Sequence, residues 1–146
     1  MRIRSTTILT NAIVSFTLAF CLTSLCPDAA ALAAPCDGII REIDNELKTK
    51  LPPIIKKQLN APSIKILQYF YFGDWSIVYV ETQISDNPFL FYSGNPLQSD
   101  FVTIWSGAAT IYEEDEIKRW VLENAPGIPE SLADCFAWHV TKARTE

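Results

Sequence analysis

Residues 64–82, IKILQYFYFGDWSIVYVET, decide the fold of this chain. Two runs rich in β-branched and aromatic residues, 64–72 and 75–82, are separated only by Gly73-Asp74. Glycine followed by aspartate suits a two-residue type II′ turn, so the stretch predicts a β-hairpin. Both faces of the hairpin are apolar. The sheet is therefore covered on each side or meets a second chain, and the covered sheet is the simpler expectation.

Two more strands are expected after the hairpin. A turn at residues 85–88 leads to a strand over residues 89–93, and a loop starting at residues 94–96 leads to a strand over residues 101–109. Short turns join all four strands, which predicts an antiparallel meander.

The chain before the hairpin has the pattern of one or two helices. Apolar residues recur at three- and four-residue intervals between residues 40 and 51, which predicts an N-terminal helix over residues 37–51 with Asp37 as its N-cap. Pro52-Pro53 should break this helix. A second short helix can restart over residues 53–59 with proline at its first position.

Two helices are expected after the last strand. Thr110 and Glu113 have the spacing of a capping box, which opens a helix over residues 111–124. Its acidic start, residues 113–116, complements the positive end of the helix and is not read as a metal site. A final helix over residues 130–138 should bury Leu132, Cys135 and Phe136.

These elements predict a single α+β domain. It consists of an N-terminal helix or helix pair, a four-stranded antiparallel meander and two C-terminal helices, with the helices on one face or at one end of the sheet. This order resembles the architecture of cystatin-like folds, and architecture alone does not fix a function.

Residues 1–33 have the pattern of a cleaved secretory signal peptide. Arg2 and Arg4 precede an apolar stretch at residues 8–25, and Ala31-Leu32-Ala33 matches a small-x-small cleavage site. The alternative is an uncleaved membrane anchor, but scattered Thr, Ser and Asn residues make this stretch a poor permanent span. No cysteine is preceded by the small residue that lipidation requires. The sequence therefore predicts a periplasmic or secreted domain over residues 34–146.

The charge of the mature chain limits the classes of partner that it can bind, and its cysteines indicate a disulfide. Cleavage after Ala33 leaves 113 residues with 10 Lys and Arg against 16 Asp and Glu. This acidity argues against nucleic acid and anionic membranes as partners, and suits a basic protein partner; it can also simply keep the domain soluble. Cys36 and Cys135 are the two cysteines left after cleavage, and in an exported chain they are expected to form a structural disulfide.

No catalytic or metal-binding pattern stands out. His139 is the only histidine, and no serine elbow motif accompanies it, so an acyl-transfer site is not expected. A lone histidine without a close cysteine pair does not fit zinc, and no calcium loop or nucleotide-binding motif is present, so no metal or cofactor is expected. Glycoside hydrolysis needs only two carboxylates, for which there are scattered candidates: Asp74, Glu81, Asp86 and Asp100.

Aromatic residues are the remaining functional signal. They fill the core, and any surplus can anchor a protein or stack on a sugar. Residues 85–100, SDNPFLFYSGNPLQSD, combine aromatic and polar side chains with two stiffening prolines. This stretch is the candidate recognition loop, with the following residues as its candidates: Asp86, Asn87, Phe89, Tyr92 and Asn95.

Three functions are compatible with these observations. The first is a non-catalytic exported binding protein, for example an inhibitor or immunity-type partner of a periplasmic or cell-wall-active enzyme. The second is a carrier of a small apolar ligand in a pocket between helix and sheet. The third is a cell-wall glycan hydrolase that uses two carboxylates.

Overall fold

The computed structural model describes residues 34–84 and 86–143, and these belong to one compact unit. The predicted signal peptide lies outside the described residues. The elements occur along the chain in the following order: α1 (Asn45–Leu59), β1 (Lys65–Phe72), β2 (Trp75–Glu81), β3 (Phe89–Ser93), β4 (Thr103–Trp105), α2 (Glu114–Asn124), α3 (Glu130–Trp138) and a π-helical turn (His139–Ala143).

The four strands form one antiparallel sheet in the order β1-β2-β3-β4, which confirms the predicted meander. The hairpin turn lies at Gly73-Asp74, and Phe72 pairs with Trp75 on either side of it. Gly73 has a φ of +62° and Asp74 has a negative φ, as a type II′ turn requires.

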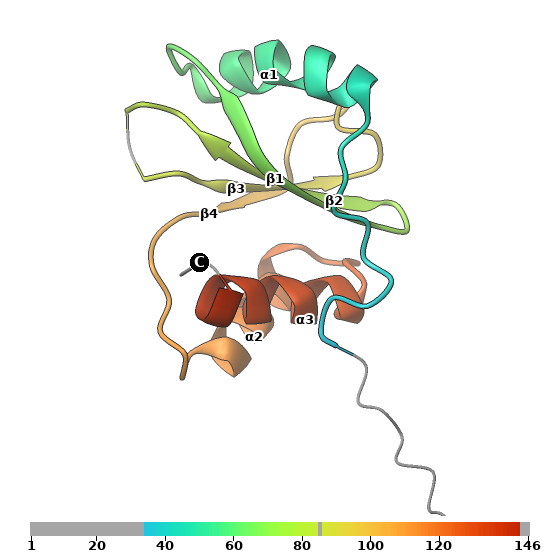
Figure 1. Cartoon of the computed structure of the whole chain (residues 1–146), viewed down its shortest axis with the longest axis vertical. Coiled ribbons are helices and arrows are strands. Elements are labelled where there is room, and N and C mark those ends of the chain that lie inside the picture. The colour runs from blue at the N-terminus through green and yellow to red at the C-terminus, as the bar shows by residue number, and fades with distance from the viewer. Residues whose placement is uncertain (1–33, 85, 144–146) are drawn as a thin grey trace, which may run out of the picture. The chain divides into compact units, whose positions relative to one another are not determined.

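The sheet is the middle of three layers (Figure 1). One of its faces packs against α1, which contributes the fully buried side chains of Leu51 and Ile55. Val78 and Leu90 are among the strand residues that meet them. Because residues alternate between the two faces of a strand, the intervening positions point to the other layer.

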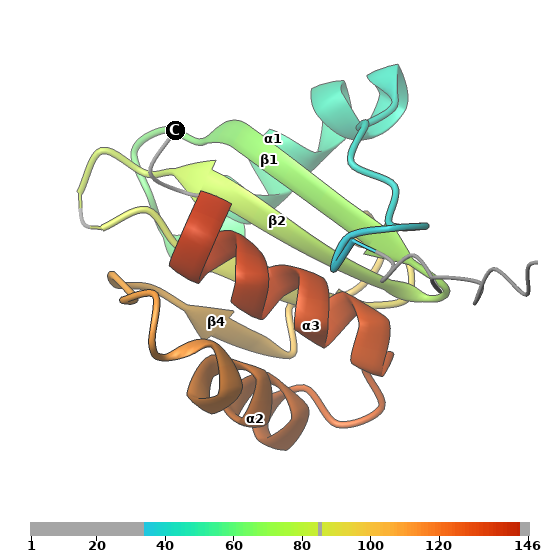
Figure 2. The same ribbon diagram turned by 60° about the horizontal axis from the view of Figure 1, so that its bottom comes forward.

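The opposite face packs against α2 and α3, which lie side by side over the sheet (Figure 2). Phe136 of α3 is fully buried there between Phe89, Phe91 and Trp105, with ring centroids 5.0–5.6 Å apart. The expectation that both faces are covered is therefore confirmed, and the expectation that helices pack on one face or at one end is wrong. Apolar residues on both faces of the strands leave two surfaces to bury, and helices from the two ends of the chain cover one each.

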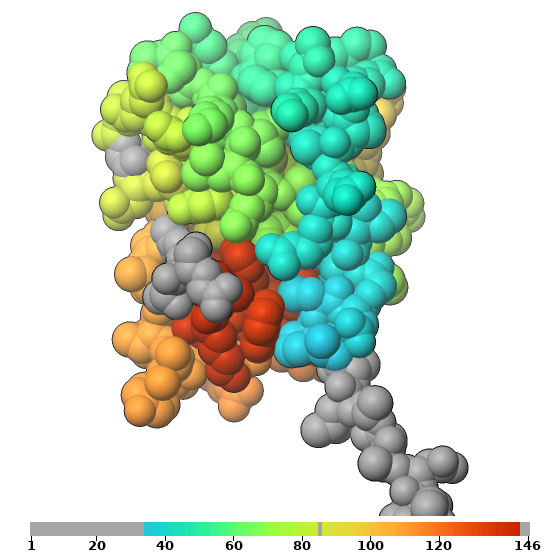
Figure 3. All heavy atoms as spheres, in the orientation of Figure 1, coloured from blue at the N-terminus to red at the C-terminus, as the bar shows by residue number. Residues whose placement is uncertain are grey.

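A disulfide joins Cys36 to Cys135 of α3, as predicted, across a sequence separation of 99 residues. It attaches the segment 34–44 to the α3 side of the sheet. The same segment then passes beside β1 and reaches the start of α1 (Figure 3). Midway along it, Ile40 and Tyr71 of β1 exchange two backbone hydrogen bonds of 3.0 and 2.8 Å.

The first helix differs from the predicted one in both bounds. α1 begins after Asp44, whose side chain accepts a hydrogen bond from the backbone N–H of Leu47. The disulfide and the Ile40 bridge hold residues 34–44 outside any helix. α1 then continues through Pro52 and Pro53, where a break was expected. Burial of one continuous apolar stripe on the sheet offsets the backbone hydrogen bonds that the prolines cannot donate.

The C-terminal part differs from the predictions mainly at the fourth strand. β4 has three residues instead of the expected nine, and residues 106–113 form a loop in which Gly107 has a φ of +130°. The Glu113 carboxylate accepts a hydrogen bond from the Thr110 N–H, so one half of the predicted capping box forms. This bond lowers the pKa of Glu113. α3 has the predicted bounds, and Leu132, Cys135 and Phe136 are fully buried as expected.

Side-chain hydrogen bonds connect α1 to β3. The hydroxyl of Tyr92, in β3, donates a 2.7 Å hydrogen bond to Gln58 Oε1 of α1. Gln58 Nε2 in turn donates to Asp100 Oδ1 at 3.0 Å. Burial, together with the nearby Asp100 carboxylate, raises the pKa of Tyr92.

In an alkaline titration, we expect Tyr92 and Tyr69 to ionise at a higher pH than a free tyrosine does. Both have pKa values raised above the ordinary value of about 10, so the fold favours their protonated forms. Stability from these two groups is present below pH 10 and is lost as the pH rises above it. Part of the tyrosinate absorbance should therefore appear only above pH 10, and Tyr92→Phe should shrink this late part. Complete ionisation of the tyrosines near pH 10 in the folded protein would contradict this.

Candidate functional site

One hollow of the described surface lies where α1 begins, and we call it the acidic groove. Its volume is about 620 Å³. Four parts of the chain line it: the segment 40–47 through Ile40, Glu42, Asp44, Glu46 and Leu47; β1 through Tyr69 and Tyr71; the hairpin turn through Asp74; and the loop 94–97.

The floor of the acidic groove is aromatic. Tyr69 and Tyr71 are two residues apart on β1, so their side chains leave the same face of the strand. Their rings are nearly parallel, with an interplanar angle of 5° and centroids 6.4 Å apart. Tyr69 is only 5% exposed, whereas Tyr71 is half-buried and shows more of its ring.

Carboxylates stand on two sides of this floor. Glu42, Asp44 and Glu46 come from the segment that enters α1, and Asp74 comes from the hairpin turn. The backbone carbonyl of Asp74 accepts a 2.6 Å hydrogen bond from Gly94 N–H, which ties the turn to the loop after β3. The floor and both walls are thus fixed by backbone pairing.

Among the residues that the structure describes, no basic side chain lines the acidic groove. Arg41 belongs to the same segment, but its guanidinium lies over the Phe70 ring, 4.9 Å from the centroid, where Phe70 packs in the α3-side core. Of the four carboxylates, Glu46 pairs with Lys50 one helical turn on, at 2.7 Å, and Asp44 caps α1. Four acidic groups without a lining cation make this hollow attractive to positive charge.

No family model matches this sequence, and no curated protein or solved structure matches it. The acidic groove is therefore interpreted from its own geometry. Among residues 34–84 and 86–143, no helix is long and apolar enough to cross a membrane.

The electrostatics of the floor follow from its surroundings. Burial raises the pKa of Tyr69 above its ordinary value, the neighbouring Ser76 hydroxyl lowers it by less, and Tyr71 and Asp44 raise it further. The phenol of Tyr69 is therefore protonated throughout the neutral range. The negative charge of the groove therefore comes from its carboxylates and not from Tyr69.

A second hollow of about 640 Å³ lies on the other side of the loop after β3. It is lined by α1 and residues 97–100, and it contains both a cation, Lys57, and an anion, Asp100. Its Gln58 and Asp100 side chains are already hydrogen-bonded to each other. Opposite charges and satisfied polar groups give this hollow a weaker preference for a ligand than the acidic groove has.

The structure disperses the residues of the predicted recognition loop. Phe89 and Tyr92 are fully buried in β3, so their rings belong to the core and cannot be offered to a partner. Asp86 and Asn87 lie in the β2–β3 connection. Asn95 alone lines the acidic groove, where its side-chain oxygen accepts a 3.0 Å hydrogen bond from Leu97 N–H. As a recognition residue, Asn95 stays a prediction.

The other candidate residues are also separated. Asp74 lines the acidic groove and Asp100 the second hollow, while Glu81 lies 3.9 Å from Lys65 Nζ. His139 is buried, with its ring centroid 5.0 Å from that of Phe70. In the described part of the chain, no three His, Cys, Asp or Glu residues could hold a metal ion together.

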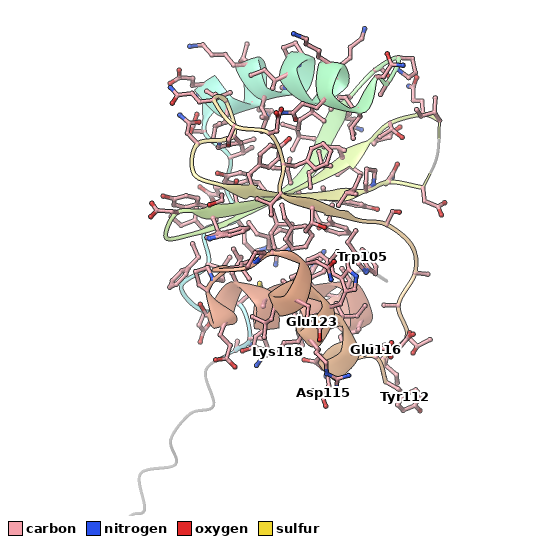
Figure 4. All side chains as sticks on the ribbon, turned by 180° about the vertical axis from the view of Figure 1, so that it is seen from behind. Trp105, Tyr112, Asp115, Glu116, Lys118 and Glu123 are labelled. Carbon is pink, nitrogen blue, oxygen red and sulfur yellow. A yellow bond between two sulfur atoms is a disulfide. The ribbon has the colours of Figure 1, made fainter. Side chains whose placement is uncertain are left out.

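The acidic start of α2 serves the packing of the C-terminal helices. Glu114 pairs with Lys142, and Lys118 lies 2.8 Å from Glu130 and 2.7 Å from Asp134 of α3. Hydrogen bonds to Asp134 and Glu130 raise the pKa of Lys118. Asp115, Glu116 and Glu123 lie on α2 (Figure 4), on the side of the sheet opposite to α1.

Sequence reasoning missed the acidic groove, although one signal was present. Glu42, Asp44 and Glu46 alternate in the chain, and so do Tyr69 and Tyr71. Alternation places residues on one side of an extended segment. The helix predicted over residues 37–51 concealed the first pattern, because residues two apart do not share a helical face.

Proposed function

We propose that this protein is an exported, non-catalytic binding protein whose acidic groove receives a basic segment of a partner protein. The observation that carries the proposal is the composition of the groove: its described lining has two parallel tyrosine rings, four carboxylates and no cation. A periplasmic or cell-wall-active enzyme is the class of partner we favour. An inhibitor or immunity-type protein needs no catalytic constellation of its own.

The disulfide supports an oxidising, exported compartment for the proposed interaction. Structural disulfides persist in oxidising compartments, and Cys36–Cys135 closes nearly the whole domain. The expected signal peptide at residues 1–33 supports the same compartment. An acidic domain exported in this way would meet basic proteins by electrostatic steering.

The carrier hypothesis has one supporting observation. A hollow of about 620 Å³ lies in the size range of small-molecule sites, and it is placed between helix and sheet. Its carboxylates suit a small amine better than the apolar ligand first considered. Native mass spectrometry of the exported protein tests this alternative, because a carrier would keep a small molecule and a protein-binding module would not.

We expect the charge of the groove to control partner binding. Glu42→Gln together with Asp74→Asn should weaken binding about tenfold, since each exposed charge pair contributes up to about 1 kcal/mol. The loss should shrink as salt is raised, because screening removes the same attraction. Asp115→Asn together with Glu123→Gln, at two exposed carboxylates on α2, removes the same two charges, is the matched control and should bind normally. Equal weakening by the control variant would show that net charge, and not the groove, matters.

A further inference from the structure

We infer that the acidic groove recognises an arginine side chain of the partner, with its guanidinium stacked on Tyr71 and ion-paired with Glu42 and Asp74. This inference rests on the proposed function and names the chemistry of its anchor. Three features support it: the parallel tyrosine rings, two carboxylates without a partner among the described residues, and the apolar rim.

Two parallel aromatic rings line the groove, and one of them is the more accessible. The Tyr69 and Tyr71 rings lie within 5° of parallel, and Tyr71 is the more exposed of the two. A guanidinium is planar and weakly hydrated, so it stacks on such a ring, whereas an ammonium is a compact, strongly hydrated charge. The chain already uses this contact once, where Arg41 lies 4.9 Å above the Phe70 ring.

Two wall carboxylates are ready to accept the guanidinium. The side chains of Glu42 and Asp74 make no ion pair or hydrogen bond with any described residue, unlike those of Asp44 and Glu46. They approach the floor from different segments, the strand-like entry to α1 and the hairpin turn. A forked cation with five N–H donors can reach two separate acceptors while stacking, which a single ammonium does less well.

The rim suits the aliphatic stem of an arginine and the residues beside it. Ile40 is 52% exposed at the edge of the groove, and Leu47 and Leu97 also line it. Arginine side chains bury their methylene groups along such surfaces while the charged head binds elsewhere. The hollow exceeds the needs of one side chain, so it also admits the neighbouring residues of a partner segment.

Three capped pentapeptides test the inference: Gly-Ala-Xaa-Ala-Gly with arginine, lysine or citrulline at the centre. Citrulline keeps the shape of arginine and lacks its charge. The probe is titrated into the ¹⁵N-labelled exported protein with its disulfide intact, and amide shifts report both site and affinity. The arginine peptide should shift amides of β1, the hairpin turn and residues 40–47. It should bind at least about fivefold tighter than lysine and more than about tenfold tighter than citrulline, for a stacked and ion-paired guanidinium.

Variants separate stacking from charge. Tyr71→Phe keeps the ring and should retain the preference for arginine, and Tyr71→Leu should abolish that preference. Glu42→Gln, at an exposed position that leaves the fold unchanged, should weaken the arginine peptide several-fold and leave citrulline unaffected. Glu123→Gln should change nothing.

Three results would overturn the inference. Equal affinity for lysine and arginine would show that charge alone is recognised, and the proposed function would survive. If Tyr71→Leu still prefers arginine to lysine, stacking on Tyr71 is not the cause of that preference. If the amide shifts lie outside the groove, or if no peptide causes any shift, the groove is not an arginine-binding site. Capture of a partner by the intact protein separately decides whether the proposed function stands.

Discussion

Cys36→Ser should lower the free energy of unfolding by about 4–5 kcal/mol under oxidising conditions, the largest single effect expected in this protein. The Cys36–Cys135 bond closes a loop that spans almost the entire domain, with a separation of 99 residues. In the chain-entropy model, such a loop strongly restricts the unfolded chain. The Cys36 side chain also packs against the α3-side core, so serine loses this contact as well.

Thermal unfolding followed by circular dichroism measures this effect. The melting temperature of Cys36→Ser should fall by about 15–25 °C. Reductant should bring the wild type down to the variant and change the variant little. Equal melting curves for the two proteins without reductant would show that the bond contributes nothing to stability.

Phe136→Ala should cost about 3–5 kcal/mol of unfolding free energy. Phe136 is fully buried and makes edge-to-face contacts with Phe89, Phe91 and Trp105. Alanine would leave a cavity among three rigid rings, and edge-to-face pairs are worth about 0.5–1.5 kcal/mol beyond their buried area. The loss therefore combines burial, cavity and ring contacts.

Urea denaturation with a matched aromatic control measures this loss. Phe72→Ala removes the same side chain from a position that is 37% exposed, and should cost about 1 kcal/mol or less. If both substitutions cost the same, the aromatic cluster under α3 does not hold the helix on the sheet.

The hairpin, β3 and α3 were predictable because local chemistry decides them. Gly73-Asp74 permits the type II′ turn, and runs of β-branched and aromatic residues favour strands on either side. α3 lies between Pro129 and the π-helical turn, and its stripe of Leu132, Cys135 and Phe136 has helical spacing. In these segments local preference and tertiary packing agree.

The start of α1 and the length of β4 could not be predicted, since long-range contacts decide them. A disulfide partner 99 residues away and a bridge to Tyr71 hold the segment before Asp44 outside the helix. The same segment then supplies one wall of the acidic groove. β4 ends early where the chain leaves the sheet toward Gly107.

The candidate site was harder to predict than the fold. The aromatic residues of the loop 85–100 are abundant, but β3 turns Phe89 and Tyr92 into the core. The tyrosines that line a hollow come instead from the hairpin itself, as Tyr69 and Tyr71. Composition indicates a surplus of aromatic residues, and only the packing shows which of them stay accessible.

The geometry also connects the disulfide to the proposed function. Cys36 precedes Ile40 by four residues, and Ile40 begins the wall that carries Glu42. The covalent bond, the Ile40 bridge and the cap of α1 together hold this wall beside β1. A preformed wall lowers the entropy lost when a partner binds.

The most direct test of the acidic groove is a comparative affinity purification from the native exported fraction. Three tagged proteins are compared: the wild type, Glu42→Gln with Asp74→Asn, and the charge-matched control Asp115→Asn with Glu123→Gln. We predict that a basic protein is recovered in stoichiometric amount by the wild type and the control, is depleted with the groove variant, and is released by salt. Recovery of the same partner by all three proteins, or of none by the wild type, would contradict the account.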